Sequence, residues 1–81
     1  MHRFFIDLTN GHGTMVDEEG QIFASPLDAS REALRVLAEI ALDEQVESDQ
    51  LSLSVNVRSA DGEILYEGKL SLTGRWIAAS L

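Results

Sequence analysis

Two histidines are the side chains of this chain best suited to bind a transition metal, because imidazole is a common zinc ligand. His2 and His12 flank the first predicted strand, where Asp7 or Asp17 could add a carboxylate. Without a cysteine or a short His-x3-His spacing they have no particular metal-binding geometry, and a metal site requires a defined set of ligands. We expect both histidines to be solvated or hydrogen-bonded, and we predict no metal and no cofactor.

A second candidate for chemistry is segment 10–20, which contains Asn-Gly-His-Gly followed by Asp-Glu-Glu-Gly. A calcium-binding EF-hand loop beginning at Asp7 would require glycine where His12 stands, and no helix is predicted before it. A phosphate-binding loop would open directly onto a helix, whereas here acidic residues follow and would repel phosphate. An exposed acidic turn is the simpler interpretation. A looser cation or ligand site stays as an alternative, with candidate residues Asn10, His12, Asp17, Glu18 and Glu19.

Catalysis by an activated nucleophile finds little support in the sequence. Ser25 is expected to cap a helix, and Ser52 and Ser54 lie on the solvent face of a predicted strand. No histidine stands at a predictable position beside any of them, and the Gly-x-Ser-x-Gly pattern of a nucleophile elbow does not occur. We therefore predict that the chain is not an enzyme and has no catalytic residue.

The net charge of the chain limits the kinds of binding partner that we expect. The 81 residues include 14 acidic and 6 basic side chains, which gives a formal net charge of −8. Such a chain repels nucleic-acid phosphates and anionic membranes, and no apolar run approaches the roughly 18–20 residues that span a bilayer. We predict binding to neither nucleic acid nor membrane. Because Asp7 interrupts the apolar start where a signal peptide would continue, we expect a cytoplasmic location.

The clearest structural signal is a hairpin near the C-terminus. Apolar and polar residues alternate over 51–58, as in a strand with one buried face, and the chain then reaches Asp61-Gly62 and a second strand over 64–73. The Asp-Gly pair predicts a type I′ turn, in which both residues have positive φ. The resulting register pairs apolar residues on one face: Val57 with Tyr66, Val55 with Gly68, Leu53 with Leu70, and Leu51 with Leu72.

A helix is predicted to begin at Pro26, because Ser25 can cap it and proline is favoured at the first helical position. Its apolar residues cover roughly two-thirds of the circumference, which is wider than contact with one sheet requires. Part of this arc could therefore bury against another chain. We expect the helix to fray over 45–47.

Two more strands complete the predicted fold. Phe4, Ile6 and Leu8 alternate with polar residues, and a short return strand fits 21–24. The order strand, strand, helix, strand, strand predicts an α+β fold (ββαββ), with a four-stranded antiparallel sheet in the order 2-1-3-4 and one helix on one face. Residues 1–73 form one domain, and residues 74–81 form an apolar tail.

The tail is unusually apolar for a chain end, where polar residues and fraying are common. Phe5 and Leu65 are predicted to point to the sheet face away from the helix. We expect Trp76 and Ile77 to dock on that face, either in the same chain or in a neighbouring subunit. The candidate interaction residues are Phe5, Leu65, Trp76, Ile77 and Leu81.

The order of short motifs resembles a known family. An Arg-Phe-Phe-Ile-Asp opening, an Asn-Gly loop, an Asp-Glu-Glu-Gly turn, an Ala/Leu-rich helix and an Asp-Gly hairpin are similar to a family of small bacterial proteins known only as a domain of unknown function. The resemblance covers roughly residues 3–72 and implies a small α+β fold without any established activity. The pattern positions are Arg3, Phe4, Phe5, Asp7, Asn10, Gly11, Asp17, Glu18, Glu19 and Gly20. The tail from Gly74 onward is not part of the pattern.

These observations favour a non-enzymatic protein-interaction module that self-associates, with a homodimer as the favoured form. One alternative is an acidic protein that inhibits a basic partner or imitates nucleic acid, because the net charge is −8. Another is a small cation- or ligand-binding domain that uses the 10–20 loop.

Overall fold

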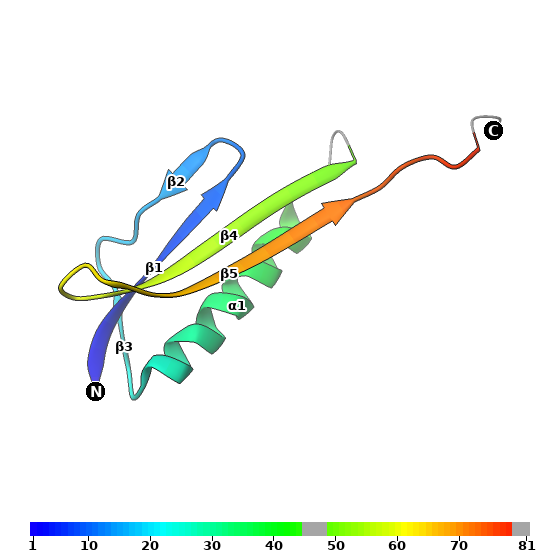
Figure 1. Ribbon diagram of the computed structural model, residues 1–81. Coiled ribbons are helices and arrows are strands. Elements are labelled where there is room, and N and C mark those ends of the chain that lie inside the picture. Colours follow the sequence, from blue (N-terminus) through cyan, green and yellow to red (C-terminus); the bar gives the residue numbers. More distant parts are fainter. Residues whose placement is uncertain (45–48, 79–81) are drawn as a thin grey trace.

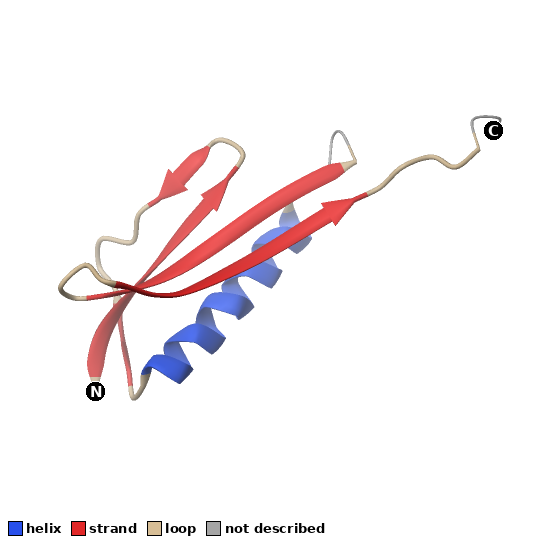
Figure 2. Ribbon diagram, viewed as in Figure 1, coloured by secondary structure: helices blue, strands red, loops and turns tan. Residues whose placement is uncertain are grey.

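In the part of the chain that this computed structural model describes, residues 1–44 and 49–78, one helix lies against one face of an antiparallel sheet (Figures 1 and 2). The α+β fold is thus the predicted one. The elements in chain order are β1 (His2–Asn10), β2 (Gly13–Met15), β3 (Gln21–Phe23), α1 (Pro26–Asp43), β4 (Gln50–Ser59) and β5 (Ile64–Thr73).

The described sheet has the order β2-β1-β4-β5, and β3 also pairs with β1. The predicted order 2-1-3-4 is confirmed, because its four strands correspond to β3, β1, β4 and β5. The additional strand β2 was not predicted. It pairs with the end of β1, whereas β3 pairs with the start of the same strand. All three residues of β2 are exposed, so no alternation of buried and exposed side chains marks it in the sequence.

The helix begins where the capping residues predict. The Ser25 side chain accepts a hydrogen bond from the Asp28 backbone N–H at 3.2 Å, and Pro26 occupies the first turn. The helix ends at Asp43, and the fraying expected over 45–47 lies outside the described residues. Within residues 1–44 and 49–78, no helix is both long enough and apolar enough to cross a bilayer.

The β4–β5 hairpin has the predicted register but a different turn. Val57 faces Tyr66 and Val55 faces Gly68, as expected. Of the two turn residues Asp61 and Gly62, only Gly62 has a positive φ, +91°, and its N–H donates to the Ser59 carbonyl at 3.0 Å. The turn is therefore a three-residue loop closed by a left-handed glycine, and the predicted type I′ turn is wrong. The loop has one residue more than the predicted two-residue turn. A β-bulge beside Val57 accommodates this additional residue, so the pairing farther along the strands is the predicted one.

The core lies between α1 and the two central strands. It consists of side chains that recur at every second strand position and along one helix face: Phe4, Leu8, Ala29, Ala33, Leu37, Leu53, Val55 and Val57. Each buried Leu, Val or Phe contributes about 1.5–3 kcal/mol relative to an exposed side chain. Gly68 lets the helix approach β5 closely, because a Cβ at this position would lie 2.8 Å from the Leu34 Cδ2. The helix thus covers β4 and β5.

Candidate interaction surface

Asp17 is the centre of the loop that joins β2 to β3. Its Oδ2 accepts the Ile6 backbone N–H at 3.1 Å, so the side chain occupies the place of a strand partner along β1. Its Oδ1 accepts the N–H groups of Glu19 (3.2 Å) and Gly20 (3.0 Å). Burial acts to raise the pKa of Asp17, but the N–H donors of Gly20, Ile6 and Glu19 outweigh it, and the pKa is lowered. Both oxygens of this carboxylate are therefore occupied by backbone donors, one in β1 and two in the loop.

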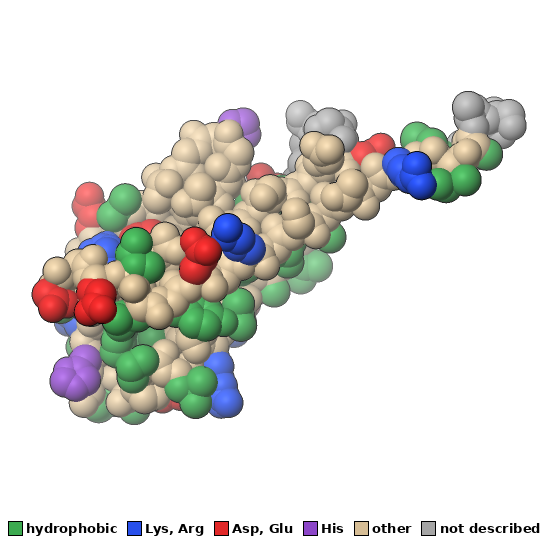
Figure 3. Space-filling view, in the orientation of Figure 1, with side chains coloured by type: hydrophobic (Ala, Val, Ile, Leu, Met, Phe, Trp, Pro, Cys, Tyr) green, Lys and Arg blue, Asp and Glu red, His purple; other side chains and the backbone are tan. Residues whose placement is uncertain are grey.

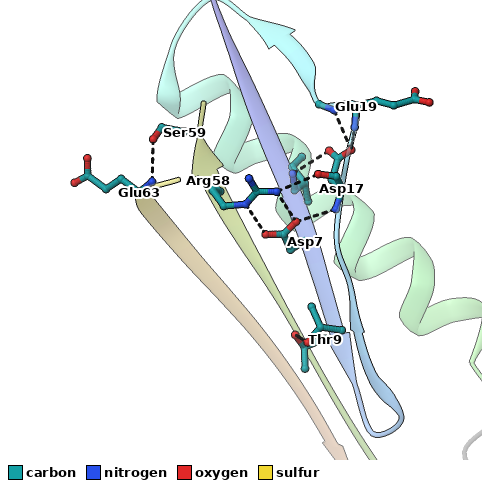
Figure 4. Close-up of polar contacts among 10 residues, drawn as sticks. Asp7, Thr9, Asp17, Glu19, Arg58, Ser59 and Glu63 are labelled. Carbon is teal, nitrogen blue, oxygen red and sulfur yellow. Dashed lines mark hydrogen bonds and ion pairs between the residues drawn. The ribbon is translucent and has the colours of Figure 1, made fainter. Parts of the chain in front are cut away.

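Asp7 and Arg58 link this loop to the centre of the sheet (Figure 4). The Arg58 Nε donates to Asp7 Oδ2 at 3.0 Å and its Nη2 to Asp7 Oδ1 at 3.2 Å. The same Nη2 donates to the Asp17 carbonyl at 3.0 Å, and the Asp17 N–H donates to Asp7 Oδ1 at 2.9 Å. The guanidinium carbon also lies 4.7 Å from the centre of the Phe5 ring. We call Phe5, Asp7, Asp17 and Arg58 the sheet-face cluster.

The electrostatics of the cluster favour a structural role. The hydrogen bonds from Arg58 lower the pKa of Asp7, and Asp7 in turn raises the pKa of Arg58. Both groups are ionised at neutral pH and directed at one another. A carboxylate held in this way is a weak base, so the cluster fastens the loop rather than moving protons.

Gly20 closes the loop against β1. Its φ is +71°, and a Cβ there would lie 2.9 Å from the Phe4 carbonyl oxygen and from the Phe5 ring. Only glycine fits this conformation without strain. Arg3 adds a further tie by donating from Nη1 to the Glu19 carbonyl at 2.8 Å. The Asp-Glu-Glu-Gly motif is thus explained by its first and last residues, whereas the Glu18 and Glu19 side chains are exposed.

The other predicted loop residues do not join Asp17. The Asn10 Oδ1 accepts the His12 N–H at 2.8 Å in the turn between β1 and β2, and the His12 side chain is exposed. Asp17 lies beside Ile6, four strand residues from Asn10, which corresponds to roughly 13 Å. The predicted loop site is therefore divided between two places. Among the residues that the structure describes, no group of three His, Asp or Glu side chains is arranged to hold a metal ion.

The predicted interaction residues are also dispersed. Phe5 is partly buried beneath Arg58, and Leu65 is 42% exposed. Trp76 and Ile77 are 72% and 82% exposed on a segment that continues away from the sheet beyond β5 (Figure 1). Docking on the sheet of the same chain is therefore wrong, because no turn reverses the chain within residues 74–78. Leu81 lies outside the described residues.

A more continuous apolar surface lies along the helix and the neighbouring strand β5. Leu34 packs over Gly68, which places the helix stripe that contains it on the β5 side. The apolar residues of this stripe recur at spacings of seven and four residues, and all of them are exposed. Figure 3 shows apolar side chains gathered below β5 in that view. We define the α1–β5 flank as Leu27, Leu34, Ala38, Leu42, Tyr66 and Leu72.

The flank is bordered by an open strand edge. β5 is the last strand in the sheet order, and within residues 1–44 and 49–78 no strand pairs with its outer side. Leu42 lies eight helix residues beyond Leu34, and Leu72 lies four strand residues beyond Gly68, so both are displaced by roughly 12–13 Å in the same direction (Figure 1). The apolar stripe and the open edge thus run side by side.

The comparison with protein families identifies the chain. The family model for the domain of unknown function DUF6894 matches residues 3–71. The chain belongs to the DUF6894 family. No curated protein and no solved structure matches it. The DUF6894 match includes the sheet-face cluster and β5 up to Ser71, and it excludes the tail, as the sequence resemblance implied.

Sequence reasoning missed Arg58 as a partner of Asp7. The available signal was the face that Arg58 occupies: its neighbour Val57 points into the core, so Arg58 points to the opposite face. In this DUF6894 chain β4 pairs with β1 so that Arg58 faces Phe5 directly. The sequence supports this contact only once the register between β1 and β4 is known.

Proposed function

We propose that this DUF6894 domain is a non-enzymatic interaction module that forms a homodimer through the α1–β5 flank. The observation that carries the proposal is the apolar stripe of α1 beside the open edge of β5. A second copy presents the same combination of open backbone groups and apolar side chains, so a symmetric contact satisfies both at once. Tyr66 and Leu72, respectively 36% and 46% exposed, would become buried in such a contact.

The size of the exposed surface supports the proposal. The chain exposes 6049 Å², whereas a compact monomer of 8.9 kDa exposes about 4800 Å². Its radius of gyration is 15.4 Å, compared with about 12 Å for a compact domain of this length. The extended segment after Thr73 accounts for much of this excess, since its Trp76 and Ile77 side chains are 72% and 82% exposed, and the exposed apolar residues of the flank add to it.

The open edge itself also favours pairing. A strand edge exposes unpaired N–H and C=O groups, and long, uncovered edges are templates for another chain. β5 is ten residues long, and the charges it carries are Glu67 and Lys69, whose opposite signs leave no net repulsion between two copies. Edge pairing of this kind is a common mode of protein recognition.

The two alternatives have weaker support. A cation site in the 10–20 loop would compete with the backbone donors that already occupy both Asp17 oxygens. An acidic face for a basic partner would use the polar side of α1, where Arg35 already pairs with Glu32 and Glu39. The sheet-face cluster gives no support to catalysis, because its charged groups are directed at one another.

Replacement of Leu34 by lysine tests the proposed function. Leu34 is 44% exposed, and lysine at this position would put a charge in the dimer contact and raise the dissociation constant by at least about tenfold. Analytical ultracentrifugation of wild type should give twice 8.9 kDa, and the Leu34→Lys chain should shift toward the monomer. Circular dichroism melts establish that the variant is folded.

The matched control is Ile22→Lys. Ile22 is 45% exposed, about as much as Leu34. It lies on β3, which pairs with β1 and is therefore far from the β5 edge of the sheet. This variant should dimerise as wild type does. A wild-type chain that sediments as a monomer at tens of micromolar, or equal weakening by both substitutions, would refute the flank as the interface.

A further inference from the structure

We infer that two β5 strands pair antiparallel about Gly68, so that Glu67 of each subunit faces Lys69 of the other. This inference rests on the proposed dimerisation and specifies its geometry. It follows from three features of β5: which residues share a face, where the charges stand, and where the helix approaches the strand.

The helices decide which faces must match. In an antiparallel pair, directly opposed residues lie on the same face of the joined sheet. Gly68 lies beneath α1, and its neighbours Glu67 and Lys69 point to the other face. Both apolar stripes come to the same side only if helix-facing residues oppose helix-facing residues. This requirement is met when the two-fold axis between the strands passes through a pair of identical residues. Near the middle of β5 these residues are Glu67, Gly68 and Lys69.

The charges select among these three axes. An axis at Glu67 would oppose two carboxylates, and an axis at Lys69 would oppose two ammonium groups, which is unfavourable for directly facing residues. The axis at Gly68 opposes Glu67 and the partner's Lys69 twice, once on each side. The Lys69 Nζ already lies 3.6 Å from Glu67 Oε1 within one chain, so the two side chains point to the same face. The pairing about Gly68 therefore brings the Glu67 and Lys69 side chains of both subunits together on one face, with each carboxylate opposite an ammonium group.

The helix face is compatible with the same axis. Tyr66 would oppose the partner's Leu70, which is an aromatic–aliphatic pair of the kind that stabilises antiparallel strands. Gly68 itself would oppose the partner's Gly68, so no side chain on the helix face separates the two Leu34 side chains that pack over these glycines. Leu34 of each subunit would therefore approach the axis.

Disulfide trapping tests the register, because the natural chain has no cysteine. A Glu67→Cys chain and a Lys69→Cys chain are purified separately, mixed under reducing conditions, and then oxidised. Opposed residues have Cα atoms about 4.5–5.5 Å apart, within the range that a disulfide spans, whereas diagonal neighbours lie at about 7–8 Å. We expect a linked dimer in the mixture and little in either chain alone.

The alternative outcomes are distinct. Efficient linkage of the Glu67→Cys chain alone, or of the Lys69→Cys chain alone, would move the axis and overturn the inference. No linkage in any sample, while ultracentrifugation of the reduced mixture gives dimers, would also overturn it and leave the proposed dimer intact. A monomeric wild type would overturn both the register and the proposed function.

A charge exchange provides an independent measurement. Lys69→Glu would oppose carboxylates at two positions, and we expect the dissociation constant to rise roughly tenfold or more. The double variant Glu67→Lys/Lys69→Glu restores the opposite pairs and should return affinity to within about twofold of wild type. Weakening without rescue by the double variant would contradict the pairing of Glu67 with the partner's Lys69.

Discussion

At the scale of residues, the Asp7 carboxylate joins three parts of the chain: its own strand β1, Arg58 of β4, and the backbone of Asp17. These contacts account for the aspartate in the opening motif and for the first residue of the acidic turn. The Arg58 guanidinium also covers the ring of Phe5, which lies on the face of β1 away from the helix.

The Asp7 and Asp17 contacts predict acid sensitivity. Both groups have a lower pKa in the folded chain than in the unfolded chain, so at low pH the unfolded state binds more protons. Their contribution to stability is complete above the ordinary aspartate pKa of about 4. It is lost as the pH falls below that value through the lowered pKa of the folded state. Urea unfolding between pH 2 and pH 7 should show this decline.

Asp7→Asn removes one of these groups and should make the decline below pH 4 shallower, while lowering stability at neutral pH through the loss of the ion pair with Arg58. Asp43→Asn serves as the control, because Asp43 is exposed at the end of the helix and lies outside the cluster. If the Asp7→Asn and wild-type curves run parallel over the whole range, the cluster does not govern acid unfolding.

At the scale of elements, the loop between β2 and β3 substitutes for a continuous strand along β1. Its closure depends on Gly20, whose positive φ and close contact with the Phe4 carbonyl leave no space for a side chain. Gly20→Ala should lower the free energy of unfolding by about 1–3 kcal/mol, which corresponds to a melting temperature lower by roughly 4–24 °C. Gly11→Ala, where a Cβ would meet nothing within 4 Å, should change it far less. Equal melting temperatures for the two variants would contradict this account.

The elements that the sequence predicts well are those specified by neighbouring residues. Alternation over β4 and β5 fixes the hairpin pairing, and Ser25 with Pro26 fixes the start of the helix. The bulge beside Val57 escapes prediction, because the same hydrophobic pattern accommodates a two-residue turn or a longer loop with one compensating residue. The hydrophobic pattern therefore determines the register more firmly than it determines the turn.

The candidate site was harder to predict than the fold because its contacts join distant segments. Asp7 and Arg58 are 51 residues apart, and their contact depends on the β1–β4 register. That register is set by core packing across three elements and not by any local motif. The α1–β5 flank was foreseen only in part: the wide apolar arc of the helix indicated surplus apolar surface, but not the strand that borders it.

At the scale of the whole molecule, the proposed axis at Gly68 predicts a contact between the exposed tail and the partner subunit. It would place Thr73 close to the start of the partner's β5, so the segment that follows would run past the partner's β4–β5 turn. Beside that turn the chain has a hollow of about 440 Å³, bordered by the start of β1, Pro26 and Ala60. Trp76 lies three residues beyond Thr73, so it would pass the partner's β4–β5 turn beside this hollow.

Fluorescence of Trp76 tests this arrangement, because it is the one tryptophan in the sequence and is 72% exposed in the single chain. As the concentration rises through the dissociation constant, its emission should shift to shorter wavelength, since contact with the partner removes water from the indole. The Leu34→Lys chain should show the same shift only at concentrations at least about tenfold higher, because its dissociation constant is raised by that factor. Emission that stays constant while the mass doubles would place the tail outside the interface, because dimerisation that covers Trp76 cannot leave its solvation unchanged.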